Sequence, residues 1–218
     1  MKVGAESDRK WMQLALTLAR RGEGLTRPNP PVGAVVVKNG RKIGQGWHQK
    51  AGGPHAEVFA LRQAGKAARG ATLYVTLEPC STFGRTPPCT DAILRAGIAR
   101  VVAAVADPNP RHAGRGLRRL RRAGIRVDAG VCAEDAGRLI APFACRMVKH
   151  RPFISLKLGL SLDGRIADHT HSSRWITGPE AREEVQALRR TADAIMVGAG
   201  TVRRDNPSLW PRPDGKRN

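Results

Sequence analysis

Three short segments of the chain carry the residues that most constrain its fold: His55-Ala56-Glu57, Pro79-Cys80 and Cys89. The histidine and the two cysteines offer one nitrogen and two sulfur ligands, a set that suits zinc. Three protein ligands leave the fourth tetrahedral position open for water, which is typical of a catalytic site and not of a closed structural one. The fold must therefore bring three separate segments to one point.

The residue types in these segments indicate hydrolytic chemistry. Zinc lowers the pKa of bound water toward neutrality, so that hydroxide can attack an aromatic amidine carbon. Glu57 lies two residues after the histidine and can carry the proton from that water to the ring and to departing ammonia. Each of the three ligands, taken alone, is more often a structural or buried residue. Their order, with Pro79 before the first thiol, matches the general signature of zinc deaminases.

Apolar patterns in the first 149 residues alternate between helix and strand. Ser7 or Asp8 is expected to cap a first helix that ends near Gly22, and Asn39-Gly40 is a hairpin turn signal. The alternation predicts a layered α/β fold in which the ligand-bearing helix starts meet beside strand ends. Further helices are expected at 55–64, 90–96, 116–123 and 134–149, and strands at 32–37, 43–47, 71–77, 101–105 and 125–127.

A second unit is expected to begin near Arg151-Pro152, which divides the chain into domains 1–149 and 150–218. Strands are expected at 153–158 and 194–197, on either side of an amphipathic helix at 180–190. The second strand runs into Gly198-Ala199-Gly200-Thr201, where the backbone either approaches a dinucleotide phosphate or makes an ordinary tight turn. The tail over 211–218 has no periodicity and is expected to fray.

The formal net charge of +20 raises the question of a nucleic-acid partner. The arginines are scattered over the whole chain, however, and aromatic residues make up only 4%, too few for an obvious base-stacking surface. We therefore expect solvated basic faces and no nucleic-acid partner.

Signals for export or membrane insertion are also missing from the sequence pattern. The first ten residues lack the apolar stretch of a signal peptide, and no apolar run approaches the length of a membrane span. Two of the four cysteines are assigned to zinc, and the others, Cys132 and Cys145, are expected in the core. These observations predict a cytoplasmic protein with no membrane partner.

The segment between the two thiols narrows the kind of deaminase. Many zinc deaminases carry Pro-Cys-x-x-Cys, whereas here the eight residues Ser-Thr-Phe-Gly-Arg-Thr-Pro-Pro separate Cys80 from Cys89. With this loop the chain resembles the bifunctional riboflavin biosynthesis deaminase/reductase family of bacteria. The stretches that carry the resemblance are PNPPVGAVVV (28–37), GWHQKAGGPHAEVFAL (46–61), TLEPCSTFGRTPPCTDAI (76–93), DPNPRHAGRGL (107–117), LKLGLSLDGRIA (156–167), WITG (175–178) and VGAGTVRRDNPSL (197–209).

The resemblance implies a fold and a first activity. The fold is a cytidine-deaminase-like three-layer α/β/α domain followed by an incomplete dihydrofolate-reductase-like α/β segment. The activity is hydrolytic deamination of 2,5-diamino-6-ribosylamino-4(3H)-pyrimidinone 5′-phosphate to the 5-amino-6-ribosylaminouracil phosphate. The resemblance places Zn²⁺ on His55, Cys80 and Cys89, the catalytic proton shuttle on Glu57, and substrate contacts on Asn29, His48 and Arg85.

These substrate contacts fit the chemistry of their side chains. Asn29 can both donate to and accept from a pyrimidine edge, and the planar fork of Arg85 suits a phosphate. One position departs from the family, which usually has histidine at the second residue after the first thiol, where this chain has Thr82. Threonine cannot carry a charge, so we expect weaker substrate binding, or compensation by Arg85 or a nearby arginine.

The second unit resembles the start of the family's reductase domain, which uses NADPH to reduce the ribosyl side chain. It is much shorter than that domain, so we expect reductase activity to be absent from this segment alone and the segment to expose unpaired strand edges. The family also tends to form homo-oligomers. The resemblance assigns NADPH contacts to Gly159, Trp175, Thr201 and Asp205, and substrate contacts to Ser173, Arg189, Leu209 and Arg212.

Two other functions are compatible with the zinc residues. A nucleic-acid base deaminase acting on tRNA would explain the basic charge, but the long loop between Cys80 and Cys89 argues against it. A zinc-binding module without turnover would have no need of the proton shuttle at Glu57. The sequence therefore favours the small-molecule deaminase over both.

Overall fold

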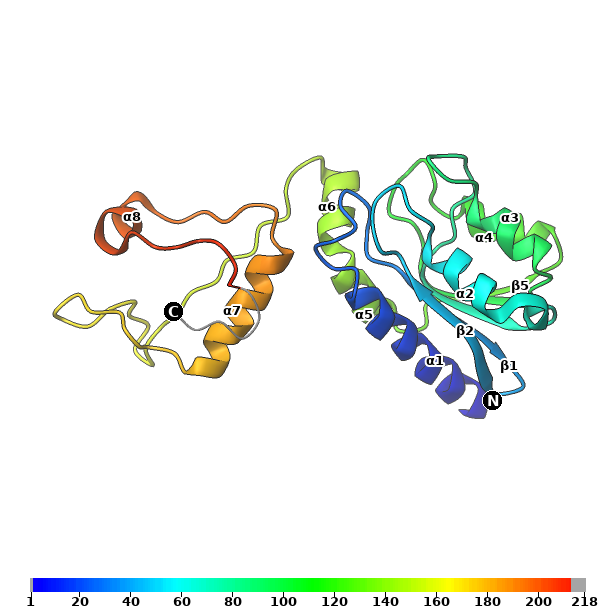
Figure 1. Ribbon diagram of the computed structural model, residues 1–218, viewed down its shortest axis with the longest axis horizontal. Coiled ribbons are helices and arrows are strands. Elements are labelled where there is room, and N and C mark those ends of the chain that lie inside the picture. Colours follow the sequence, from blue (N-terminus) through cyan, green and yellow to red (C-terminus); the bar gives the residue numbers. More distant parts are fainter. Residues whose placement is uncertain (1, 213–218) are drawn as a thin grey trace. The chain divides into compact units, whose positions relative to one another are not determined.

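Five strands form one mixed sheet in the computed structural model, which describes residues 2–212. The sheet order is β2-β1-β3-β4-β5; β1 pairs antiparallel with β2 and with β3, while β3, β4 and β5 run parallel (Figure 1). The parallel strands direct the loops that follow them to one edge of the sheet. The strands are β1 (Gly33–Lys38), β2 (Arg41–Trp47), β3 (Thr72–Leu77), β4 (Arg100–Val105) and β5 (Arg126–Ala129).

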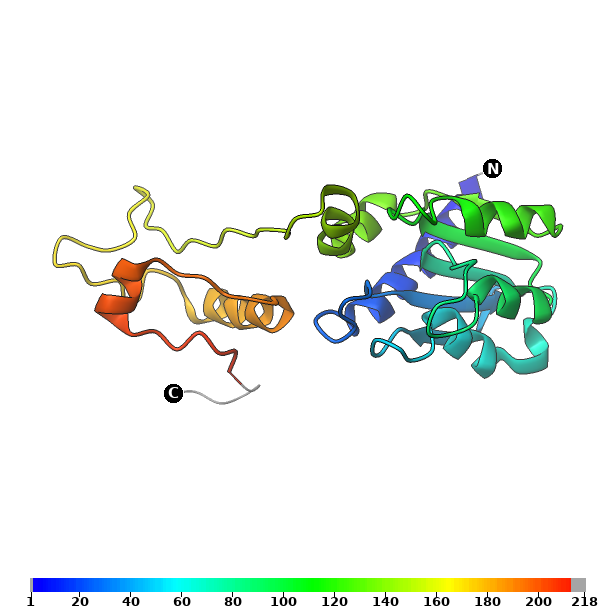
Figure 2. The same cartoon turned by 90° about the horizontal axis from the view of Figure 1, so that it is seen from above.

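Helices cover both faces of this sheet (Figures 1 and 2). Side chains alternate across β1: Val35 and Val37 pack with one helical layer, and Ala34 and Val36 pack with the other. The first layer contains α1 (Lys2–Arg20) and α5 (Ala133–Leu139); the second contains α2 (Ala56–Ala64), α3 (Cys89–Arg95) and α4 (Arg115–Arg122). This arrangement confirms the expected three-layer α/β/α domain.

Two glycines of β2 set how closely α2 approaches the sheet. A Cβ atom on Gly44 would lie 2.2 Å from the backbone oxygen of Ala60, and one on Gly46 would lie 2.4 Å from Cβ of Phe59. Neither position can take a side chain without pushing the helix away. The close approach fixes the start of α2, and therefore the position of His55 at its N-cap.

In this domain, the observed ends of helices and strands differ from the expected ends by at most two residues, with two exceptions. The helix expected at 134–149 is in fact two helices, α5 and α6 (Ala141–Lys149), with a break at Ile140. Pro142 lies in the first turn of α6, where the missing N–H is harmless, but its ring would clash inside a continuous helix. The expected single helix is therefore wrong, because Pro142 breaks it.

The second exception is the cap of the first helix, which begins at Lys2 and not after Ser7 or Asp8. Asp8 lies inside α1 and faces the sheet, where it accepts hydrogen bonds from both terminal nitrogens of Arg100, at 2.8 and 2.7 Å, and from the Tyr74 hydroxyl at 2.7 Å. Arg100 also donates to Asp128 at 2.6 Å. This network fastens α1 to β3, β4 and β5.

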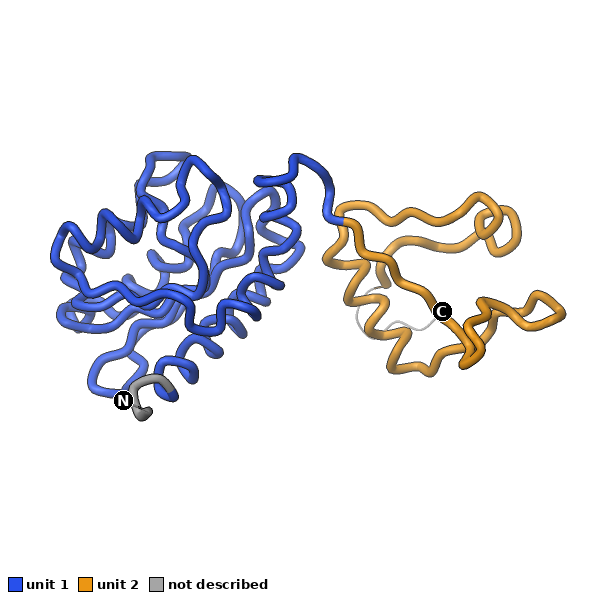
Figure 3. Tube along the Cα trace, turned by 180° about the vertical axis from the view of Figure 1, so that it is seen from behind, with its two compact units in different colours: residues 1–153 blue, residues 154–218 orange. Residues whose placement is uncertain are grey.

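Residues 154–212 of the second unit contain two helices, α7 (Pro179–Thr191) and α8 (Ala199–Asp205); Figure 3 shows the division of the chain between Phe153 and Ile154. The helix expected at 180–190 is therefore confirmed. The strands expected at 153–158 and 194–197 are wrong, because no described residue pairs with either segment. The apolar side chains of the first segment, among them Leu156 at 82% exposure, have no core to enter.

The glycine-rich stretch after residue 197 is not the tight turn that formed one of the two expectations, while the approach of its backbone to a dinucleotide phosphate stays a prediction. Gly198 is the N-cap of α8, so Ala199, Gly200 and Thr201 form the first turn of a helix and not a tight turn between strands. Most of the tail that was expected to fray, 213–218, lies outside the described residues. Across 2–212, no helix combines the length and the apolar character needed to cross a bilayer.

The Asp8 network makes a prediction about stability. Hydrogen bonding from Arg100 lowers the pKa of Asp8 below its ordinary value of 3.8. This stabilisation is fully present above the unfolded pKa and is lost as the pH falls through the lower folded pKa. Asp8→Asn should therefore reduce the free energy of unfolding by about 1–3 kcal/mol near neutral pH, and the difference from wild type should shrink in acid.

Urea denaturation of both proteins across acidic pH, with a chelator present so that metal loss does not contribute, measures the effect. Glu6→Gln, an exposed change on the same helix, is the matched control. A constant difference between Asp8→Asn and wild type at all pH values would show that the carboxylate charge is not what stabilises the network.

Candidate metal centre

Three elements bring the expected ligands together at one edge of the sheet. His55 is the N-cap residue of α2, Cys80 lies three residues beyond the end of β3, and Cys89 is the first residue of α3. The His55 Nδ1 atom lies 3.5 Å from the Cys80 sulfur and 3.3 Å from the Cys89 sulfur. All three ligand atoms lie within 4.8 Å of one another, as a metal site requires.

The two thiols differ in pKa, because one donates a hydrogen bond to the other. Hydrogen bonds from Cys89 and His55 lower the pKa of Cys80 to about 4, and the Cys89 backbone N–H also donates to the Cys80 sulfur at 3.2 Å. The pKa of Cys89 is raised, because its thiol holds the proton that it donates to Cys80. The pKa of His55 is raised by its hydrogen bond with Cys80. A cation bound here would displace these protons.

Glu57 lies beside the ligands in the first turn of α2 and is only 3% exposed. Burial, with the nearby Cys80 charge, raises its pKa to about 7. Its Oε2 atom has no hydrogen-bond partner among the described residues. A buried carboxylate oxygen is costly to leave unpaired, and its place beside one nitrogen and two sulfur donors fits a catalytic zinc ion that those three donors would hold.

Asn29 and His48 lie next to the same ligands. The buried His48 ring packs edge-on against His55, with ring centroids 5.2 Å apart. Because its Nδ1 atom lies 3.0 Å from the Pro54 carbonyl oxygen, which can only accept, Nδ1 carries the proton. Burial lowers the pKa of His48, so Nε2 is free to accept from the Asn29 amide nitrogen at 3.1 Å. The pair thus fixes the Asn29 amide beside the metal centre.

The loop between the two cysteines carries the remaining expected positions. Arg85 is exposed, and its side chain lies over Gly52, where a Cβ would be 3.7 Å from the Arg85 Cδ atom. Thr82 is exposed too, and its Oγ1 lies 3.5 Å from Nδ1 of His112. His112 belongs to the stretch DPNPRHAGRGL (107–117) and was not among the expected site residues.

A buried carboxylate that the sequence analysis missed supports the same region. Glu78 lies two residues before Cys80 and accepts four backbone hydrogen bonds: from Asp107 and Gly114 to Oε2, at 3.0 and 2.8 Å, and from Gly116 and Leu117 to Oε1, at 2.8 and 3.3 Å. Its partners are main-chain groups that every residue has, so no sequence signal marks them.

The expected reductase positions are spread over the second unit. Trp175 is exposed and stacks with Arg182 at 4.1 Å, while Thr201 and Asp205 lie on α8. A cavity of about 480 Å³ is lined by Ser173 and Trp175 but not by the α8 residues. The other positions lie in loops or on α7: Gly159; Leu209; Arg189, which donates to the Ser208 carbonyl; and Arg212, whose N–H donates to Gln186.

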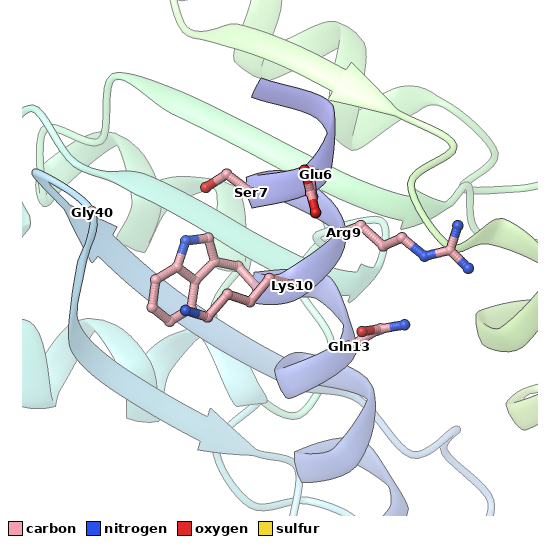
Figure 4. A pocket seen from close by; sticks show the side chains of 7 residues that line it. Glu6, Ser7, Arg9, Lys10, Gln13 and Gly40 are labelled. Atoms are coloured by element: carbon pink, nitrogen blue, oxygen red, sulfur yellow. The ribbon is translucent and has the colours of Figure 1, made fainter. Parts of the chain in front are cut away.

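Another cavity, of about 600 Å³, lies beside α1 and the β1–β2 turn (Figure 4). Its lining residues are Glu6, Ser7, Arg9, Lys10, Trp11 and Gln13 of the helix and Gly40 of the turn. None of the candidate site residues lines it. The candidate site therefore does not include this cavity.

Comparison with known proteins agrees with both parts of the chain. Residues 5–105 match the family described as the cytidine and deoxycytidylate deaminase zinc-binding region, and residues 152–218 match the RibD C-terminal domain. The riboflavin biosynthesis protein RibD of Aquifex aeolicus is 56% identical over 207 residues, which are 95% of this chain and 58% of that protein. RibD of Escherichia coli is 55% identical over 94% of this chain and 56% of its own length.

A solved structure extends the agreement to three dimensions. The diaminohydroxyphosphoribosylaminopyrimidine deaminase/5-amino-6-(5-phosphoribosylamino)uracil reductase of Thermotoga maritima aligns with a TM-score of 0.90 at 47% identity, over 99% of this chain and 62% of that one. The chain thus spans little more than half the length of the curated relatives it matches. The comparisons confirm the expected fold class: a cytidine-deaminase-like domain followed by part of a reductase domain.

The ligand geometry predicts one bound zinc per chain. Cys80→Ser and Cys89→Ser should each lower the zinc content to a small fraction of wild type, because each removes one of three protein ligands. Cys145→Ser, which changes a half-buried cysteine outside the cluster, is the matched control and should keep its zinc. Elemental analysis of the purified proteins gives the comparison; zinc retained in both ligand variants would rule out the assigned site.

Proposed function

Because this chain belongs to the family of the riboflavin biosynthesis protein RibD, we propose that its first unit is a zinc-dependent deaminase of a phosphorylated ribosylaminopyrimidine. The reaction is the hydrolysis of 2,5-diamino-6-ribosylamino-4(3H)-pyrimidinone 5′-phosphate to the 5-amino-6-ribosylaminouracil phosphate and ammonia. The observation that carries the proposal is the buried, unpaired Glu57 oxygen beside His55, Cys80 and Cys89. A structural zinc site has no use for such a group.

The three ligands would hold the metal, with His55 bound through Nδ1, the atom that faces both sulfurs. Zinc at this position supplies Lewis-acid activation of water at neutral pH. The Cys80 sulfur accepts a backbone N–H bond from Cys89, which favours the thiolate form that binds metal, whereas Cys89 has to release its proton when the metal binds.

Glu57 moves the protons of the reaction. Its Oε2 atom accepts a proton from the attacking water and delivers it to the ring nitrogen of the amidine; the second proton of the water then goes to the amine, which leaves as ammonia. The carbon exchanges its amine for oxygen, and no oxidant or reductant is needed. Burial of Glu57 keeps bulk water away from this transfer.

Other side chains position the substrate in this proposal. The Asn29 amide, held by His48, lies beside His55 and can bind the pyrimidine edge. Arg85, exposed on the loop between the cysteines, can reach the 5′-phosphate with its planar fork. We propose deamination for the first unit only, and the expected absence of reductase activity from the second unit alone stays a prediction.

We further propose that the protein works in the cytoplasm, where its metal-binding thiols stay reduced. The homo-oligomer that the family resemblance implies stays a prediction, which the molecular mass of the protein in solution can test.

Glu57→Gln tests the proposed chemistry. The amide cannot accept the proton, so ammonia release should fall at least about 100-fold, while the zinc content should stay at the wild-type level. Glu23→Gln on the surface is the control for a lost carboxylate. If Glu57→Gln kept more than a tenth of wild-type turnover, another group would have to carry the proton.

A nucleic-acid substrate predicts a different response to salt. Binding that neutralises several phosphates weakens steeply as salt rises, whereas a small substrate with one phosphate should respond mildly. We expect kcat/KM for the pyrimidine phosphate to change less than about fivefold between 50 and 200 mM salt, well below the change expected for a multi-phosphate contact. Deamination of a tRNA with steep salt dependence, and none of the small substrate, would reverse the assignment.

A further inference from the structure

Two loops meet above the metal ligands. One runs from Ser81 to Pro88 between the cysteines, and the other follows β4 and leads into α4. They touch where Oγ1 of Thr82 lies 3.5 Å from Nδ1 of His112. Because Thr82 is two residues past Cys80, this contact brings an imidazole from a distant part of the sequence to the rim of the metal site.

The loop that carries His112 is held firmly in place. Glu78 accepts N–H bonds from both of its ends, at Asp107 and Gly114. Within the loop, the Asn109 carbonyl accepts from the N–H of His112 at 2.8 Å and from that of Ala113 at 2.9 Å. Glu78, which holds the loop, lies two residues before Cys80 at the end of β3. The loop that carries His112 is therefore anchored to the segment that carries the metal ligand.

The helix after the loop lies equally close to the ligand segment. A Cβ on Gly116 would be 2.0 Å from the Pro79 backbone oxygen, so α4 starts in direct contact with the residue before Cys80. A side chain at this position would push the helix and its loop away from the metal site.

The surroundings of His112 suit an anion. The ring is half-buried, and within residues 2–212 only Nδ1 has a hydrogen-bond partner, so Nε2 is available. Asp107 lies at the start of the same loop, where its N–H donates to Glu78. Arg85 lies on the facing loop, three residues after Thr82.

The position of the catalytic carboxylate orients the substrate. Glu57 is almost fully buried, so the pyrimidine ring has to enter first and the ribosyl phosphate has to stay at the exposed rim. Imidazole and guanidinium N–H donors on that rim match a phosphate, because hydrogen bonds to an ionised phosphate oxygen are strong.

We propose that His112 is a substrate-binding residue that contacts the 5′-phosphate, with Thr82 holding its ring. The proposal rests on the proposed deaminase function. It replaces the expectation that an arginine compensates for Thr82, since the side chain that contacts Thr82 is a histidine.

The test compares KM and kcat for ammonia release by the zinc-loaded 218-residue chain. His112→Ala should raise KM about tenfold or more, the usual cost of one charged hydrogen bond, and leave kcat within about twofold, because the residue lies outside the proton path. With the dephosphorylated ribosyl substrate, His112→Ala and wild type should have the same KM. His169→Ala, which removes an exposed histidine of the second unit, should leave KM unchanged.

A second variant separates binding from a structural effect. Thr82→His places an imidazole on the facing side of the contact. The double variant Thr82→His/His112→Ala should therefore have a KM closer to that of wild type than to that of His112→Ala. Loop disruption would not be rescued in this way. An unchanged KM in His112→Ala, or an equal rise with and without the phosphate, would overturn the proposal.

Direct binding keeps this result independent of turnover. In the Glu57→Gln background, calorimetry should show the substrate bound about tenfold more weakly when His112 is also replaced by alanine. If wild type released no ammonia but this difference in Kd were found, the deaminase proposal would fail while the His112 assignment stood. Equal affinity, or no binding by either protein, would overturn the assignment of His112.

Discussion

The parallel pairing of β3 with β4 is the constraint on which the site depends. Thr72 to Leu77 align with Arg100 to Val105, so the segments that leave both strands emerge at one edge. The first segment carries Glu78 and Cys80, and the second carries Asp107 and His112. Glu78 then joins the two by accepting backbone N–H bonds from the second segment. The metal ligands and the rim of the site are thus parts of one hydrogen-bonded assembly.

The sequence predicted the fold and the site correctly wherever the structural role of a residue depends on its own chemistry or on its neighbours in the chain. His55, Cys80 and Cys89 indicated zinc through ligand chemistry, and the alternation of strand and helix segments along the chain predicted a layered α/β fold. It failed where the determinant was a partner distant in the chain. Asp8 looked like a helix cap because its partner, Arg100, lies 92 residues away.

The same reason explains why the strand predicted at 153–158 is wrong and why His112 was missed. Residues 153–158 have the alternation of a strand, but a strand exists only if a neighbour supplies hydrogen bonds, and no described residue does so. His112 carries no signal of its own, since its meaning comes from the Thr82 hydroxyl 30 residues earlier. Pro142 is different: it was visible in the sequence, and its effect on the helix follows from local sterics.

The fixed tautomer of His48 determines the orientation of the Asn29 amide. Since Nδ1 donates to the Pro54 carbonyl, Nε2 must accept, and the Asn29 amide must turn its nitrogen toward it. The amide then keeps its oxygen and its second N–H for other partners, so it can still both accept and donate. Its orientation is therefore set by the Pro54 carbonyl on the far side of the His48 imidazole, an atom that makes no direct contact with Asn29.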